Sequence, residues 1–196
     1  MKEDFLFPYQ QGFDFVNTLY SRGKWKAVDA AYANPPVTTE QILHPEKYPD
    51  EKPVVVEIGD YIYDLGPGWS EYDRNVMGEW YTYLILGAGR SANIRLNQED
   101  AKTAAAGWGG DTYLFLINET SNVTAFIWLS TWDTQKDSNE FFEASRDYGN
   151  ARWGNSVESE SDLVSWDSTQ EGSITMVHND RYVLWAISQD EKVVDT

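Results

Sequence analysis

Two histidines are the residues of this chain best suited to metal or acid–base chemistry, and they lie far apart in the sequence. His44 is followed closely by Glu46, whereas His178 lies near the C-terminus. A catalytic zinc ion usually takes three protein ligands and keeps one position open. His44, Glu46 and His178 are therefore the candidate metal ligands, but no His-Glu-x-x-His or similar local pair accompanies them. We expect His44 to end a helix before Pro45, His178 to lie in a polar hairpin turn, and no metal to be bound.

Carboxylates are abundant, but their spacing identifies no acid–base pair. Asp133, Asp137 and Glu140 could line one face of a helix and attract a hard cation. Calcium needs about six to eight oxygen ligands, and the loop spacing that supplies them is missing here. The chain also has no Gly-x-Ser-x-Gly sequence and no phosphate-binding P-loop. We therefore predict no catalytic residue and no cofactor, and we expect these carboxylates to cap and solvate a helix start.

The charge of the chain excludes some classes of partner. Its 196 residues include 32 acidic and 15 basic side chains, which gives a net charge of −17. Nucleic acid requires clustered lysine and arginine, so we predict no nucleic-acid binding. No apolar run is long enough to span a membrane, so we predict no direct membrane insertion. The absence of cysteine excludes disulfides and cysteine-based zinc sites.

Helical periodicity dominates residues 1–48, which we interpret as a helical segment. A first helix is predicted over 9–22, where Phe13, Val16 and Tyr20 recur at helical spacing with Phe15 and Leu19 alongside, and Gly23 is its expected end. A second short helix should follow and stop before two consecutive prolines. The Thr-x-x-Gln sequence that begins at Thr38 has the form of a capping box and predicts one further helical turn.

Residues 49–190 carry mixed strand and helix signals and form the predicted main domain. Strands are predicted over 54–58, 112–117, 123–131, 162–166, 173–177 and 181–187, and helices over 76–86, 98–106 and 135–148. This order predicts an α+β fold, in which short N-terminal helices precede an antiparallel sheet packed with helices. Residues 191–196 are predicted to be a loose tail.

Two Asn-x-Thr sequons lie in the turn expected between the strands over 112–117 and 123–131. Asn118 begins the first sequon and Asn122 begins the second. Such sequons accept glycans on exposed loops of secreted proteins. Asn118 and Asn122 are therefore candidate glycosylation sites, and they agree with a surface location.

Three segments, Phe7–Tyr48, Ala104–Asp111 and Trp128–Phe142, carry a family resemblance that is strongest in the first. They resemble the C-terminal portion of archaeal and bacterial surface proteins related to zinc metallopeptidases. In those proteins a His-Glu-x-x-His helix lies upstream of such segments, and no position of this chain matches its zinc ligands or general base. The resemblance therefore implies a chain without the catalytic region, which either begins inside a longer protein or is a stand-alone relative.

The function implied by this resemblance is a non-catalytic accessory or interaction domain, extracytoplasmic or at the cell surface. Its partner would be a missing upstream peptidase-like domain or another protein. Two alternatives stay open: an independent module that binds a glycan or peptide in an aromatic pocket, and a hydrolase with an unrecognised site. A large exposed apolar patch on the helices over 5–32 would favour docking, whereas a well-formed apolar pocket with convergent polar groups would favour the binding module.

Overall fold

The protein folds around a single antiparallel sheet, which confirms the predicted α+β class. A computed structural model describes residues 2–59, 62, 64–89 and 91–194. Within these residues, seven strands pair in the order β1-β2-β3-β7-β6-β5-β4. The strands are β1 (Trp69–Asn75), β2 (Trp108–Asn118), β3 (Val123–Trp132), β4 (Glu158–Ser159), β5 (Leu163–Ser168), β6 (Gly172–Asn179) and β7 (Tyr182–Ser188). The helices are α1 (Lys2–Ala33), α2 (Thr39–Leu43), α3 (Gly78–Gly87), α4 (Gln98–Ala105), α5 (Gln135–Trp153) and α6 (Glu191–Val194).

Two long hairpins meet in the middle of the sheet. In the first, β2 and β3 pair from Trp108 opposite Trp132 to Asn118 opposite Val123. In the second, β6 and β7 pair up to Asn179 opposite Tyr182, which confirms the predicted hairpin, although His178 lies in β6 and not in the turn as predicted. Because β3 also pairs with β7, the two hairpins form one continuous surface.

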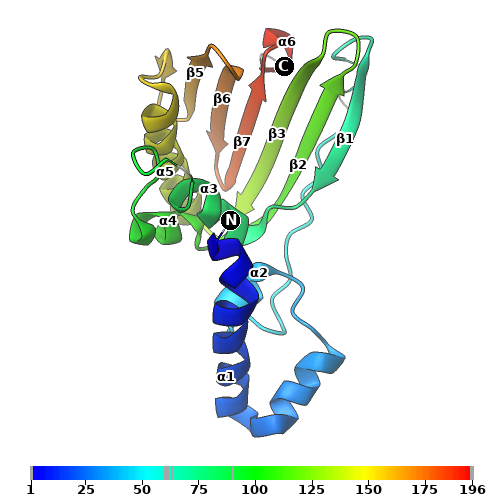
Figure 1. The fold of residues 1–196 in the computed structure, drawn as a ribbon, viewed down its shortest axis with the longest axis vertical. Helices are drawn as coiled ribbons and strands as arrows, with labels where there is room; N and C mark the ends of the chain where they lie inside the picture. Colours follow the sequence, from blue (N-terminus) through cyan, green and yellow to red (C-terminus); the bar gives the residue numbers. More distant parts are fainter. Residues whose placement is uncertain (1, 60–61, 63, 90, 195–196) are drawn as a thin grey trace.

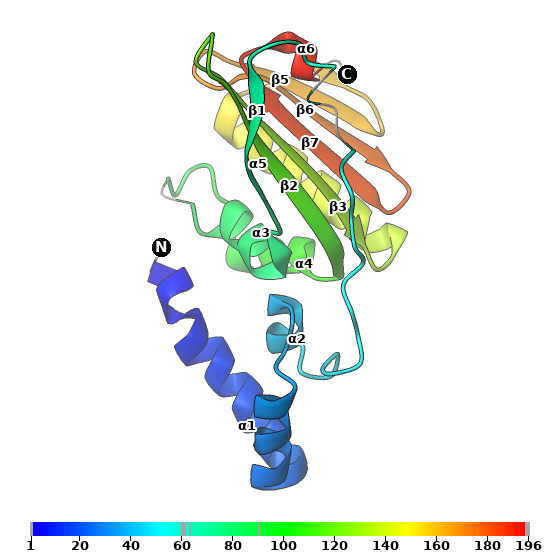
Figure 2. The same cartoon turned by 90° about the vertical axis from the view of Figure 1, so that its right-hand side faces the viewer.

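Apolar side chains pack on both faces of the sheet, so the domain has two cores. On one face α5 lies across the strands (Figure 2) and contributes Phe141 and Phe142, which are fully buried. The Phe141 ring stacks on Trp132 at a centroid distance of 4.5 Å. On the other face, Leu116 of β2 belongs to a smaller cluster with Ile58 from the segment before β1. Residues from the chain segments that flank the sheet therefore close its second face.

The long helix α1 projects away from the sheet as an arm (Figures 1 and 2). Its helical backbone is interrupted at Gly23 and Lys24, which confirms the break predicted at Gly23. The arm still differs from the short helices that were predicted, because the first half already begins at Lys2. Phe15 and Leu19 of the first half and Val28 of the second form a small buried cluster, so the kink folds the two halves against each other.

The predicted strand over 54–58 is not a strand in the structure. This segment runs alongside β2 and makes isolated contacts with it. The Val54 amide donates to the Gly109 carbonyl (2.7 Å), and the Thr112 hydroxyl donates to the Val56 carbonyl (2.6 Å). The edge position beside β2 is taken instead by β1, which the sequence did not predict. The sequence of β1 is mostly polar and exposed, and so lacks the apolar alternation of a half-buried strand.

The remaining elements agree with the predictions, apart from the short strand β4, which was not predicted, and the C-terminal end. The helices α3, α4 and α5 and the strands β2, β3, β5, β6 and β7 all overlap their predicted ranges. Residues 191–194 of the predicted loose tail instead form the short helix α6, whose Val193 is buried in the second core, and residues 195–196 lie outside the described residues. No helix among the described residues combines the length and the apolar character needed to cross a membrane.

Candidate functional site

A row of exposed apolar side chains runs along the first half of α1. It consists of Phe5, Tyr9, Phe13, Val16 and Tyr20, which we call the arm stripe. Side chains three or four positions apart lie on the same side of a helix, so these five form a continuous surface. Tyr9 is 77% exposed and Phe13 is 65% exposed. Such a contiguous apolar surface is typical of an interaction site.

The opposite side of the arm is the side that packs. The sequence placed two sets of apolar residues on this helix, and the structure buries Phe15 and Leu19 while it exposes Phe13, Val16 and Tyr20. The Phe15 ring meets the Tyr48 ring edge to face at 5.3 Å, which ties the arm to the segment that follows α2. The arm stripe is thus exposed to solvent and available to a partner.

Contacts with α3 fix the orientation of the arm. The Phe7 ring lies 4.6 Å from the Trp80 ring. The Tyr83 hydroxyl donates to a Glu3 carboxylate oxygen (2.9 Å), and the Trp80 indole N–H donates to Asp4 (3.3 Å). These contacts come from the side of α1 that faces the domain, so the arm stripe is presented outward.

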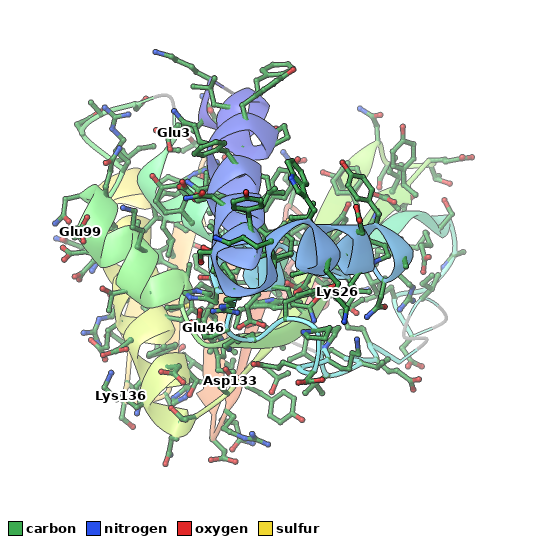
Figure 3. The ribbon with its side chains drawn as sticks, turned by 90° about the horizontal axis from the view of Figure 1, so that it is seen from below. Glu3, Lys26, Glu46, Glu99, Asp133 and Lys136 are labelled. Carbon is green, nitrogen blue, oxygen red and sulfur yellow. The ribbon has the colours of Figure 1, made fainter. Side chains whose placement is uncertain are left out.

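Lys47 is the centre of a polar junction between residues 40–51 and the end of β3. Its ammonium group donates to carboxylate oxygens of Glu40 (2.7 Å), Glu51 (2.9 Å) and Asp133 (2.6 Å). Asp133 follows β3 directly, and Figure 3 labels it close to Glu46, which belongs to the segment after α2. Burial raises the pKa of the Glu40 carboxyl to about 7, although the hydrogen bond from Lys47 opposes this shift.

The three carboxylates around Lys47 have a spacing that could hold a metal ion. Oxygen atoms of Glu40, Glu51 and Asp133 all lie within 4.8 Å of one another. The Lys47 ammonium, however, already contacts all three and neutralises part of their charge. The arrangement is therefore a clamp that fastens the residues after α1 to the end of β3.

Half-buried His44 forms an acid–imidazole pair with the buried Glu79 of α3. The Nε2 atom of His44 lies 2.8 Å from Oε1 of Glu79, and its Nδ1 lies 3.7 Å from Glu46. The hydrogen bond with Glu79 raises the pKa of His44, and burial raises the pKa of Glu79. The second Glu79 oxygen is buried and has no hydrogen-bond partner among the described residues. Such a pair can hold a proton between its two groups.

The His44–Glu79 pair forms part of the wall of a cavity between the arm and the domain. The cavity has a volume of about 720 Å³ and is also lined by Glu3 of α1, Tyr83 of α3 and Lys102 of α4. His44 is at the same time the C-terminal cap of α2, as the sequence predicted. Both nitrogen atoms of its ring face protein carboxylates. The position of His44 is set by the end of α2, which it caps.

His178 occupies a different environment, at the turn between β6 and β7. Its Nε2 lies 3.0 Å from the Ser138 hydroxyl and 2.8 Å from the Asp180 carbonyl oxygen. The ring stacks on Phe142 at 5.3 Å. His178 has none of these partners in common with His44, whose contacts are Glu46 and Glu79. The structure therefore brings His44 and Glu46 together and gives His178 a role at the start of α5.

The carboxylates considered as cation ligands near α5 have local partners. Asp137 and Thr134 form a reciprocal capping box at the N-terminus of the helix. Glu140 pairs with Lys136 one turn earlier (2.6 Å). The predicted capping role is confirmed for Asp137, while Asp133 is part of the Lys47 clamp.

The two sequon asparagines differ in accessibility. Asn118 is buried, and its side-chain oxygen accepts hydrogen bonds from the backbone N–H groups of Thr120 (3.0 Å) and Ser121 (3.1 Å). Asn122 is exposed at the tip of the same turn, with a φ of 55° that asparagine tolerates well. The geometry therefore favours Asn122 over Asn118 as a site for a glycan.

Sequence reasoning missed three buried acids, Glu40, Glu79 and Asp111. The Asp111 carboxylate accepts from the backbone N–H groups of Met77 (2.7 Å) and Gly78 (2.9 Å) and from the Trp108 indole (2.7 Å). It thus anchors the start of α3 to β2, and burial raises its pKa. A signal was present for Glu79 and Asp111, because each adjoins a segment of apolar and aromatic residues. His44, Met77 and Gly78, however, lie more than thirty positions away from the acids that they contact.

Comparison with known proteins gives one match. Residues 67–196 match DUF8575, a family described as a domain of unknown function. No curated protein and no solved structure is detectably similar to the chain. The matched residues contain the complete sheet and α3 to α6, while α1 and α2 precede them. Because this match spans more than half of the sequence, the chain belongs to the DUF8575 family.

Proposed function

We propose that this protein is a non-catalytic interaction domain that associates with a second copy of itself through the arm stripe. The observation that carries this proposal is the exposure of Phe5, Tyr9, Phe13, Val16 and Tyr20 on one side of α1. An exposed apolar surface of this kind costs solubility, and it is removed from water when a partner helix packs against it.

The spacing of the stripe suits a helical partner. Tyr9, Phe13, Val16 and Tyr20 are separated by four, three and four positions. This alternation is the apolar seam of a coiled coil, in which each helix inserts its side chains between those of the other. A second copy of α1 carries the same seam and can therefore pack on it with twofold symmetry.

The charge distribution also favours contact between two arms. Residues 2–33 contain four basic and four acidic side chains, so the net charge of −17 lies entirely in the rest of the chain. Like charges oppose the approach of two copies through their sheet domains. The arm is neutral and extends away from the sheet (Figure 1), so it is the part through which two copies can meet with the least repulsion.

An accessory role outside the cytoplasm forms part of this proposal. It is supported by the resemblance to the C-terminal portion of metallopeptidase-like surface proteins and by the exposed sequon at Asn122. A hydrolase has less support, because His44 and His178 both make contacts that position local structure. The binding-module alternative is supported by a separate groove, which is described below.

Sedimentation velocity over a wide range of protein concentration tests the proposal. We expect the unmodified chain to dimerise reversibly. Phe13→Glu introduces a charge at the centre of the stripe and should weaken dimerisation roughly 30-fold or more, as expected when a central interface residue worth at least ~2 kcal/mol is lost. Val157→Glu is the matched control, because Val157 is also 65% exposed but lies outside the arm.

Two results would count against self-association through the stripe. A chain that stays monomeric at every concentration would exclude the second copy as the partner. A dimer that Phe13→Glu and Val157→Glu affect equally would place the interface away from α1. Backbone NMR spectra of both variants would show that each has kept its fold.

A further inference from the structure

A second surface feature lies within the sheet domain, between the C-terminal end of α5 and the strands. It is a groove of about 320 Å³, a size at the lower end of pockets that take small molecules, roughly 300–1,000 Å³. Rings contributed by three strands and α5 form most of its wall. These are Phe115, Phe126, Trp128, Tyr148, Trp153 and Trp185.

Aromatic packing holds the rings of the groove in place. The Trp153 ring lies 5.8 Å from the Trp185 ring and 5.5 Å from the Trp166 ring, while Trp166 stacks on Trp185 at 6.1 Å. The Trp166 indole N–H also donates to Asn150 of α5 (3.0 Å). The wall is thus largely pre-formed, which lowers the entropic cost of binding a flat ligand.

Trp185 has an unused hydrogen-bond donor. The side chain is buried, and its indole N–H has no acceptor among the described residues. Buried indole groups usually find an acceptor, because a donor without one loses its hydrogen bond to water. Trp185 lines the groove, and its N–H lies just beneath the wall, so a ligand that carries an acceptor could supply the missing partner once the neighbouring rings shift to admit it.

The charged groups at the mouth of the groove neutralise each other. The Arg152 guanidinium donates to Glu171 (2.5 Å) and to the Tyr148 hydroxyl (2.7 Å). The second Glu171 oxygen accepts from the Trp153 indole (2.5 Å). An anionic ligand would have to displace Glu171, and a cationic ligand would have to displace Arg152. The mouth therefore favours a ligand without net charge.

We infer that the groove binds a small uncharged molecule that combines a flat apolar ring with a hydrogen-bond acceptor. The ring would stack among Trp153, Trp185 and Phe126, and the acceptor would receive the Trp185 indole N–H. All the residues that line the groove lie within 67–196, the part of the chain shared with the family. The site is thus independent of the arm and of its role in self-association.

Titration of the full chain with two isosteric probes tests the inference. Quinoline is uncharged at neutral pH and carries a ring acceptor, whereas naphthalene has the same shape without one. In ¹H–¹⁵N spectra, we expect quinoline to shift the indole N–H resonance of Trp185 saturably and to bind about tenfold more tightly than naphthalene, which corresponds to one hydrogen bond of ordinary strength. Trp185→Phe assigns that resonance and should remove the preference for quinoline.

A pair of matched variants locates the binding site. Thr124 is exposed at the rim of the groove, so Thr124→Trp should obstruct it and weaken quinoline binding at least tenfold. Thr175→Trp makes the same change on β6, outside the groove lining, and should leave binding unchanged. Equal effects of the two variants, no saturable shift, or equal affinity for both probes would each overturn the inference.

Discussion

The arm and the sheet domain use their aromatic residues in opposite ways. In the sheet domain Trp108, Trp132 and Trp166 are each only 1% exposed, and they form the centre of the main core. In the arm, Tyr9 and Phe13 are among the most exposed apolar side chains of the protein. Aromatic residues therefore stabilise the core of the sheet domain, whereas in the arm they form an exposed apolar surface.

This contrast indicates how each region is stabilised. The sheet domain is stabilised by apolar clusters that are buried on both of its faces. The arm has a buried cluster of only three residues, Phe15, Leu19 and Val28, and depends on its contacts with α3 and on the Lys47 clamp. The family match covers the seven strands and α3 to α6, while α1, α2 and Ile58 of the second core precede it.

The same truncation in the two regions should give the largest difference in stability. Phe141 is fully buried between Trp128 and Trp132, so Phe141→Ala should lower the free energy of unfolding by roughly 3–5 kcal/mol. Phe13→Ala removes an exposed ring and should change it by less than about 0.5 kcal/mol. Urea unfolding followed by circular dichroism, at a concentration where the protein is monomeric, measures both.

A large loss of stability for Phe13→Ala in the monomer would contradict the comparison. It would mean that the stripe packs against the chain's own surface in solution. A small loss for Phe141→Ala would show that the core beneath α5 can collapse around the missing ring.

The Lys47 clamp should make the stability of the junction depend on pH. Burial raises the pKa of Glu40 from 4.5 to about 7, so the folded protein binds more protons at this carboxyl than the unfolded chain. This contribution to stability is complete below pH 4.5 and is lost as the pH rises through about 7. His44, whose pKa is also raised, loses its contribution in the same direction as the pH rises above 6.5.

Replacement of Glu40 by glutamine isolates its part of this pH dependence. We expect the stability difference between the unmodified protein and Glu40→Gln to change by roughly 1–2 kcal/mol across that pH range, after allowance for solvent screening. Unfolding curves at a series of pH values give the difference. Glu51→Gln removes a more exposed carboxylate from the same lysine and serves as the matched control for the loss of one charge at the clamp. Parallel curves for the unmodified protein and Glu40→Gln would show that Glu40 titrates as it does in the unfolded chain.

The sequence predicted most of the elements where a local signal exists. Periodicity and capping residues, such as Thr134 and Asp137 at the start of α5, were sufficient for the helices. The pairs of Glu79 with His44 and of Asp111 with Met77 join distant segments. Local sequence patterns cannot predict such contacts, because they form only when the chain folds. The edge strand β1 escaped prediction because its pairing with β2 relies on the backbone, while its side chains are mostly polar.

The candidate surfaces show the same division between local and distant information. Helical spacing marked the apolar residues of α1, yet it could not tell which row would be buried, because that depends on α2, α3 and Tyr48. A binding module with an aromatic pocket was left open as an alternative, but the groove requires β2, β3, β7 and α5 to meet. Which of the nine tryptophans line it was therefore outside the reach of the sequence.

The kink of the arm offers the smallest effect and the sharpest test of its geometry. Lys24 has a φ of 57° and a ψ of −152°, a conformation that is essentially restricted to glycine. Lys24→Gly should relieve about 1 kcal/mol of backbone strain and lose about 0.5 kcal/mol from the cation–π contact with Tyr20, for a small net gain. Lys26→Gly makes the same substitution two positions later, inside the second half of the helix (Figure 3), and should instead cost about 0.5–1 kcal/mol. Hydrogen exchange of the arm amides resolves these opposite signs, and a loss of protection in both variants would mean that Lys24 is helical and that the arm is straight in solution.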